Sequence, residues 1–329
     1  MDLKNIFINS AGRLRSGWRL LIFVLVYICI LFLLSSLARL AYAAALNLVP
    51  QRIGSDYAQN VVFRLILLVA ALAAGFVCTR WLEGLPWRAL GLWFHTGWFR
   101  HLLVGSLIGV FSLALATAIA TAGGGLTFTI SGRAGMVRVF QTLLLSGALF
   151  VVAALAEEAL FRGYPLQTLS RAKLAWLGVF LTSVPFAAVH LQNPNVAAGF
   201  TFINTALAGV WLAVAYLRTR TLWFPLGVHW AWNWALGSLF GLPVSGLTNL
   251  APYPLMRGTD HGPAWLTGGS YGIEGGLACT ITLAITTIFI LRTRLISTAP
   301  EMETLTSQEN PVGKGEVGKR GTGETVDED

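Results

Sequence analysis

Long apolar runs, separated by short polar segments, make up most of the first 300 residues of the chain. A helix needs about 20 mostly apolar residues to cross the hydrocarbon core of a bilayer. Eight segments come near this length: 18–40, 59–80, 100–122, 138–162, 173–190, 196–217, 221–241 and 272–292. The pattern therefore predicts an all-α polytopic membrane protein with about eight transmembrane helices.

The polar segments divide the chain into six regions. We expect a cytoplasmic N-terminal segment, N-terminal transmembrane helices, a core region, an external loop, a last transmembrane helix and a cytoplasmic tail: 1–17, 18–135, 136–242, 243–271, 272–297 and 298–329. The tail holds eight of the fifteen acidic residues and no aromatic residue. Such a segment has little apolar surface to bury, so the tail is predicted to be disordered.

The charge pattern bears on partners and orientation. The net charge is +8, but the basic residues flank apolar segments instead of forming a patch with interleaved aromatic side chains. This argues against a nucleic-acid partner and favours membrane lipid. Apart from Arg162 and the tail, thirteen Lys and Arg residues fall on the side of the N-terminus and six on the other. Since cytoplasmic loops carry the excess of positive charge, both termini are predicted to be cytoplasmic.

Polar and ionisable side chains interrupt three of the apolar segments. A charge at the centre of a bilayer costs roughly 2.5–3.5 kcal/mol, so such residues face a bundle interior or a water-filled cavity. The residues concerned are Glu157, Glu158, Arg162, His190, His229 and Asn233. Each set alone is consistent with an ion pair or with hydrogen bonds that hold helices together. Together they predict an intramembrane polar site.

Helix periodicity assigns partners within these sets. Residues four apart share a helix face, so Glu158 can pair with Arg162. Glu157 is rotated by about 100° and remains available, with a histidine, to take a proton from water. His229 and Asn233 share a face and can donate to the oxyanion of a tetrahedral intermediate. These parts suit peptide hydrolysis. His and Glu are also zinc ligands, but the sequence has no HExxH pair, and we favour a reaction without a metal.

Three motifs at these positions resemble those of a known family. EExxxR stands at 157–162, FxxxH at 186–190 and HxxxN at 229–233, in that order and on predicted membrane spans. They are similar to the motifs of the CPBP group, which comprises the type II CAAX prenyl endopeptidases and bacteriocin-processing enzymes and is also called the abortive infection family. The resemblance covers about residues 140–240.

The resemblance implies an intramembrane endopeptidase that acts on a membrane-associated peptide or protein. It implies that Glu157 and His190 activate water, and that His229 and Asn233 form an oxyanion hole. Residues that hold the helix and support the site would be Glu158, Arg162 and Phe186. The alternatives are a non-catalytic scaffold or bacteriocin-immunity-type binding protein on the same fold, and a proton-coupled transporter. The transporter is disfavoured because no inverted repeat is present.

The depths of the proposed catalytic residues in the membrane disagree. Proline disfavours a helical residue before it, so the first of these helices should end or kink near Gly163 and Pro165, about two turns past Glu157. His190 lies seventeen residues past Lys173, or ~26 Å along a helix. We therefore expect the helix of His190 to be strongly tilted or to begin deeper. The Glu157 carboxylate should then lie within about 3–5 Å of the His190 ring, or be bridged to it by one water.

Overall fold

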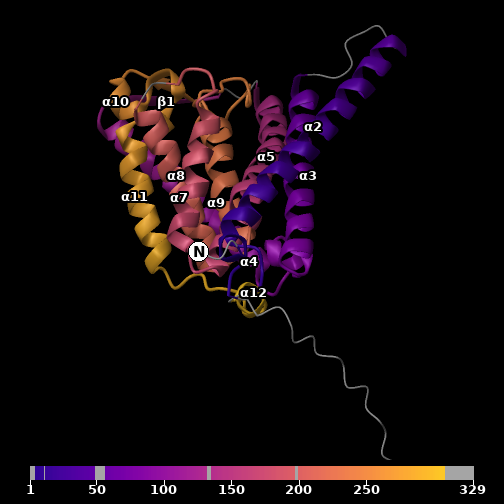
Figure 1. Cartoon of the computed structure of the whole chain (residues 1–329). Coiled ribbons are helices and arrows are strands. Elements are labelled where there is room, and N and C mark those ends of the chain that lie inside the picture. The colour runs from indigo at the N-terminus through magenta and orange to yellow at the C-terminus, as the bar shows by residue number, and fades with distance from the viewer. Residues whose placement is uncertain (1–3, 11, 49–55, 132–134, 197–198, 308–329) are drawn as a thin grey trace, which may run out of the picture.

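The computed structural model is mostly helical (Figure 1). It describes the chain except residues 1–3, 11, 49–55, 132–134, 197–198 and 308–329. The α-helices are α1 Lys4–Phe7, α2 Ser16–Leu48, α3 Asp56–Leu82, α4 Trp98–Ala122, α5 Met136–Glu158, α6 Tyr164–Arg171, α7 Ala175–His190, α8 Phe200–Thr219, α9 Trp223–Trp234, α10 Ala264–Thr267, α11 Leu277–Arg292 and α12 Pro300–Thr306. The strands are β1 Leu126–Ile130 and β2 Met256–Asp260, and short 3₁₀ or π helices are Trp87–Leu90, Ala159–Gly163, Ala235–Leu239, Gly269–Tyr271 and Ile273–Gly275.

Five helices in the described residues are long and apolar enough to cross a membrane. They are Ser16–Ala44, Tyr57–Leu82, Trp98–Ala122, Met136–Arg171 and Phe200–Thr219. The other three predicted spans form shorter helices: α7 and α11 have 16 residues each, and α9 has 12 before it continues as a π-helix. A helix of 16 residues is ~24 Å long, below the thickness of the hydrocarbon core. The expected number of eight spans is therefore not confirmed.

The two strands correct the expectation of a purely helical fold. β1 pairs with β2 in an antiparallel register that places Leu126 opposite Asp260 and Ile130 opposite Met256. β2 and α10 lie within the segment 243–271, which was expected to be an external loop. β1 combines threonine and bulky apolar residues, which favour strands, and it follows α4 closely enough to reach this segment.

The C-terminal segment is ordered further than the sequence predicts. α12 lies inside the range 298–329, which was expected to be disordered. Met302 is fully buried, and the Trp93 indole donates a hydrogen bond to its sulfur at 3.2 Å. Two side chains of α12, Met302 and Thr306, are buried against the body of the protein, so the disorder prediction is wrong for these residues. Residues 308–329 lie outside the described part.

One long rod carries the first motif. The π-helix at 159–163 joins α5 to α6, so that a single apolar helix runs over Met136–Arg171. The helix was expected to end or kink near Gly163 and Pro165. It continues past Pro165, which falls in the first turn of α6, and its geometry changes to a π-helix just before that turn. A proline there removes a backbone donor that has no partner within its own helical segment, and the π-helix absorbs the change in geometry.

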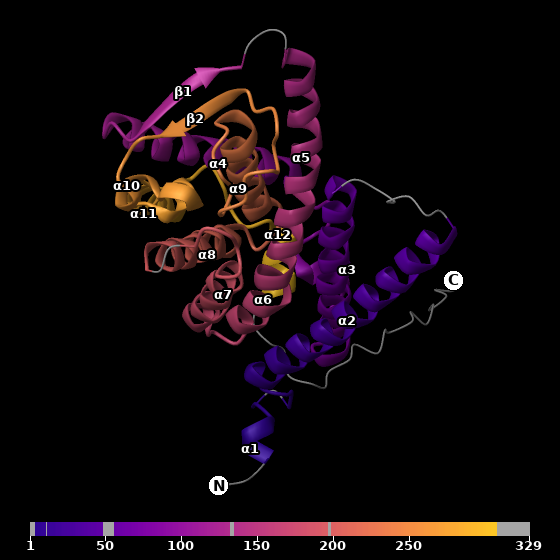
Figure 2. The same ribbon diagram turned by 90° about the horizontal axis from the view of Figure 1, so that it is seen from above.

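The N-terminal helices pack on this rod. α3 contacts both α2 and α5, and Figure 2 shows it between them. The Tyr57 hydroxyl on α3 donates to the backbone oxygen of Leu145 on α5 at 2.8 Å. At the other end of α3, the buried Glu83 carboxylate pairs with Arg19 of α2 and Arg171 of α6. α3 is therefore fixed to α5 and α6 at both of its ends.

Close packing against α4 positions α9, the helix that carries the third motif. Gly105 and Gly109 of α4 face Gly227 and neighbouring backbone of α9. A Cβ at Gly109 would overlap the carbonyl oxygen of Val228, the residue before His229. Small residues spaced four apart let helix backbones approach in this way. The depth of His229 is thus set by contact between α4 and α9.

We predict that Gly109→Ala destabilises the protein. The added methyl must push α9 away, and overpacking of this kind costs ~1–3 kcal/mol. The measurement is the thermal unfolding midpoint in detergent. Gly17→Ala is the control, since Gly17 lies in α2 with nothing within 4 Å of its Cβ position. Equal midpoints for the two variants would show that the α4–α9 contact is not as tight as described.

Candidate active site

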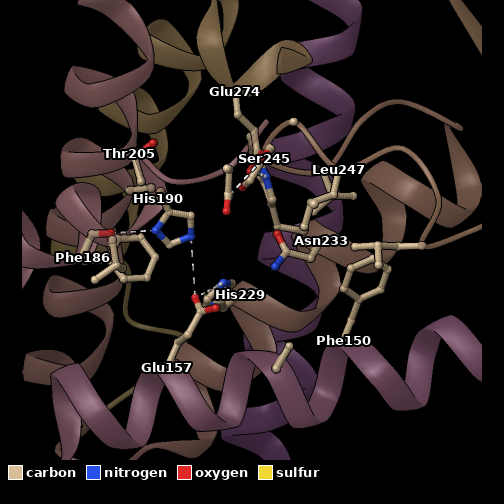
Figure 3. Close-up of a pocket in the computed structure, with 18 of the residues that line it drawn as sticks. Phe150, Glu157, Phe186, His190, Thr205, His229, Asn233, Ser245, Leu247 and Glu274 are labelled. Atoms are coloured by element: carbon tan, nitrogen blue, oxygen red, sulfur yellow. Dashed lines mark hydrogen bonds and ion pairs between the residues drawn. The ribbon is translucent and has the colours of Figure 1, made fainter. Parts of the chain in front are cut away.

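A cavity of about 690 Å³ contains the residues that the motifs single out. Figure 3 shows Glu157, His190, His229 and Asn233 around one space. They come from α5, α7 and α9, which lie apart in the sequence. Phe186 also lines this cavity. Glu158 and Arg162 do not line it, and both are completely buried behind it.

The carboxylate of Glu157 faces both histidines. Its Oε2 atom lies 4.0 Å from Nε2 of His190 and 3.7 Å from Nε2 of His229. The first distance falls within the 3–5 Å expected from the sequence. The rod explains why depth is no obstacle: Glu157 lies fourteen residues, or ~21 Å, before Arg171, and His190 lies fifteen residues, or ~22 Å, after Ala175. No strong tilt of α7 is needed once α5 continues into α6.

The hydrogen bonds of the two Nδ1 atoms fix the orientations of the His190 and His229 rings. Nδ1 of His190 lies 2.7 Å from the backbone oxygen of Phe186, and Nδ1 of His229 lies 2.8 Å from Oε1 of Glu158. A backbone carbonyl only accepts, and so does an ionised carboxylate, so we infer a hydrogen on each Nδ1. In the neutral rings, both Nε2 atoms then offer a lone pair toward Glu157. Each can accept a proton there, and each can donate only after it has gained one.

Glu158 is buried next to the cavity and binds two residues of the site, Arg162 and His229. Arg162 donates to Oε1 of Glu158 at 3.1 Å, as the i, i+4 spacing predicts, and also to the backbone oxygen of Gly209 on α8 at 3.1 Å. The Arg162 guanidinium also lies over the Phe186 ring, 4.5 Å from its centre. The same Glu158 oxygen contacts His229. One buried carboxylate therefore connects α5, α8 and α9 through its two partners.

Arg64 of α3 is a charged neighbour of Glu157 that the sequence reasoning missed. Its Nη1 lies 3.5 Å from Oε1 of Glu157. The sequence pattern had placed this residue among basic residues that flank a membrane span. Its position inside the apolar segment 59–80 was the available signal, since a charge there needs a partner.

Glu274 is a second carboxylate on the wall of the cavity. Its Oε1 accepts a hydrogen bond from the Trp232 indole at 3.0 Å, and its Oε2 accepts from the backbone and hydroxyl of Ser245 at 2.5 and 3.1 Å. Burial raises the pKa of nearby Tyr271 to about 12, and the Glu274 charge adds to this shift. Glu274 thus ties α9 to the segment that follows it, a role that no spacing pattern in the sequence indicated.

Within the described residues, no group of three or more His, Cys, Asp or Glu side chains has an arrangement that could hold a metal ion. The Glu157 carboxylate lies 3.7 Å from Nε2 of His229 and 4.0 Å from Nε2 of His190, and one water can bridge polar atoms at these separations.

Comparison with known proteins places the chain in a family. A family model described as type II CAAX prenyl endopeptidase Rce1-like matches residues 138–235. An Escherichia coli protein, described as an uncharacterized 24.3 kDa protein, is 32% identical over 180 residues, which is 53% of this chain and 77% of the relative. The chain belongs to the Rce1-like family. No solved structure matches it significantly.

Membership of the Rce1-like family confirms the predicted resemblance. The matched residues run from α5 to α9 and so include all three motifs, whereas Arg64 and Glu274 lie outside the match. The family description is that of an endopeptidase. With five apolar helices of sufficient length, the protein is an integral membrane protein. The cytoplasmic location of both termini stays a prediction.

We predict that Glu158→Gln lowers the amount of folded protein in membranes and its unfolding midpoint. The amide keeps the shape but leaves Arg162 without its buried counter-charge, and breaking a buried pair costs about 3–5 kcal/mol. Size-exclusion profiles and thermal unfolding of the purified protein measure the effect. Glu303→Gln is the control, because Glu303 is exposed on α12. A Glu158→Gln protein as stable as this control would remove the structural role of Glu158.

Proposed function

We propose that the protein is an intramembrane endopeptidase that hydrolyses a peptide bond of a membrane-associated protein or peptide. The observation that carries the proposal is the Glu157 carboxylate, which faces two Nε2 atoms at 3.7 and 4.0 Å inside one cavity. The family assignment supports the same reaction class. Glycosidases and phosphatases also use carboxylates, but nothing in this cavity favours their substrates.

The first step needs a water between Glu157 and His190. Two atoms 4.0 Å apart can both hydrogen-bond one water at about 2.8 Å. Glu157 takes a proton from this water while the water oxygen forms a bond to the carbonyl carbon of the substrate. The π electron pair of the carbonyl group moves to the carbonyl oxygen, which becomes the oxyanion. The unprotonated Nε2 of His190 accepts a hydrogen bond from the second water hydrogen and so aims the oxygen lone pair.

The second step needs donors for the oxyanion. The Asn233 amide supplies N–H groups in the same space. His229 is neutral before the reaction and has its Nδ1 hydrogen committed to Glu158, so its Nε2 can donate only after it gains the proton that Glu157 has taken from the water, 3.7 Å away. The Glu158 carboxylate stabilises the imidazolium that forms. A positive ring beside a new negative oxygen strengthens this contact in the transition state. The C–N bond then breaks, and the same proton passes from His229 to the leaving amine, which restores the neutral ring.

We predict that Glu157→Gln abolishes cleavage while the protein stays folded. The amide cannot take a proton from water, and general base catalysis contributes about 10²–10⁴-fold to rate. The measurement compares the termini of membrane peptides in cells that contain wild-type protein, Glu157→Gln or the control Glu303→Gln. Peptides should be processed with wild type and with the control only. Unchanged processing in the Glu157→Gln cells would contradict the assignment and favour a non-catalytic binding protein on this fold.

We also predict that activity does not depend on a bound metal. The wild-type protein, purified in active form, should contain substoichiometric zinc and should keep its activity after treatment with a chelator. Elemental analysis and turnover of an identified peptide measure these two quantities. One tightly bound metal per chain, with activity lost on its removal and restored on its return, would replace the water-activation account with a metalloprotease.

A further inference from the structure

Arg64 reaches the site from a helix that lies outside the matched family core. α3 precedes residues 138–235, and its Arg64 lines the same cavity as Glu157. The Arg64 side chain is 27% exposed, and its Nη1 lies 3.5 Å from Oε1 of Glu157. The contact with the Tyr57 hydroxyl, two turns earlier on α3, keeps this helix against α5. The packing of α3 against α5 therefore places the Arg64 guanidinium beside Glu157.

The two oxygens of Glu157 have different neighbours. Oε1 faces Arg64, whereas Oε2 faces Nε2 of both His190 and His229. A carboxylate held in this way presents one fixed oxygen to a water and to the histidines. Free rotation would instead exchange the two oxygens and carry the acceptor lone pairs away from the water. The guanidinium thus acts on orientation as well as on charge.

The charges of the two adjacent glutamates balance only when Arg64 is included. Glu157 and Glu158 supply two negative charges, and Arg162 supplies one positive charge that lies on Glu158. With both histidines neutral, the remaining negative charge of Glu157 has Arg64 as its counter-charge. An unpaired carboxylate in apolar surroundings takes up a proton instead of bearing the cost of desolvation. A protonated Glu157 cannot accept a proton from water.

The other carboxylate on the cavity does not compete for Arg64. Glu274 accepts hydrogen bonds from Trp232 and Ser245 through both of its oxygens. Arg162 is likewise engaged, by Glu158 and by the backbone oxygen of Gly209. Among the residues that line the described cavity, Arg64 is thus the arginine available to Glu157.

We propose that Arg64 is a positioning residue that keeps Glu157 ionised and turns its Oε2 toward the histidines. This inference rests on the proposed function, because it assigns Arg64 to the same hydrolytic step. It also makes the N-terminal helices part of the working site: α3 supplies a cation that residues 138–235 do not place on Glu157.

The protonation of Glu157 tests the proposal without any substrate. Infrared difference spectra of purified protein, taken at neutral pH between each variant and the same variant with Glu157→Gln, isolate the signal of this side chain. Wild type should show the stretch of an ionised carboxylate. Arg64→Gln should show the carbonyl stretch of a protonated acid, and Arg64→Lys should restore the carboxylate. The control Arg39→Gln removes an exposed arginine of α2 and should resemble wild type.

A peptide that depends on Glu157 in cells supplies the second readout. Arg64→Gln should lower kcat for this peptide about 10²-fold with little change in KM, and Arg64→Lys should recover part of the loss. An ionised Glu157 in the Arg64→Gln protein would overturn the inference, even if cleavage by wild type were established. The expected infrared change without any Glu157-dependent peptide would support the role of Arg64 in ionising Glu157 and contradict the proposed hydrolysis.

Discussion

A charge inside an apolar bundle needs a counter-charge, and this constraint governs the arrangement of the site. The Glu158 carboxylate, fully buried, binds Arg162 and His229, and thereby connects α5, α8 and α9. Glu157, one residue earlier, points to the cavity and meets Arg64 of α3. The two adjacent glutamates thus pair with different arginines, Arg64 and Arg162, and contact the two ring nitrogens of the same histidine, His229. Glu158 connects the helices, and Glu157 lines the cavity.

Helix packing sets the depth at which these charges meet. The rod of α5 and α6 is long enough to place Glu157 near its middle, and the turn into α7 returns His190 to the same level. Contact between the glycines of α4 and the backbone of α9 brings His229 to this level as well. Because the positions of these helices depend on steric packing, a small shift of one helix would separate the groups that share one water in the proposed mechanism. The packing of the helices therefore sets the distances from Glu157 to His190 and His229.

Much of the site follows from spacing, because residues four apart share a helix face. That rule gives the Glu158–Arg162 pair directly, and the motif order gives the family. Spacing did not indicate that α5 continues past Pro165 into α6, since proline is tolerated in the first turn after a π-helix. Strand pairing of β1 with β2 and burial of Met302 depend on contacts between distant segments, which periodicity does not report. Arg64 was missed for the same reason, as its partner lies 93 residues away.

The central claim, that Glu157 and Arg64 compensate each other, is tested most directly by a double-mutant cycle. Unfolding free energies are measured in detergent for wild type, Glu157→Gln, Arg64→Gln and the double variant. If the two charges depend on each other, the double variant should be more stable than the sum of the single changes indicates, by about 0.5 kcal/mol or more. Additive changes, within about 0.3–0.5 kcal/mol, would contradict the account.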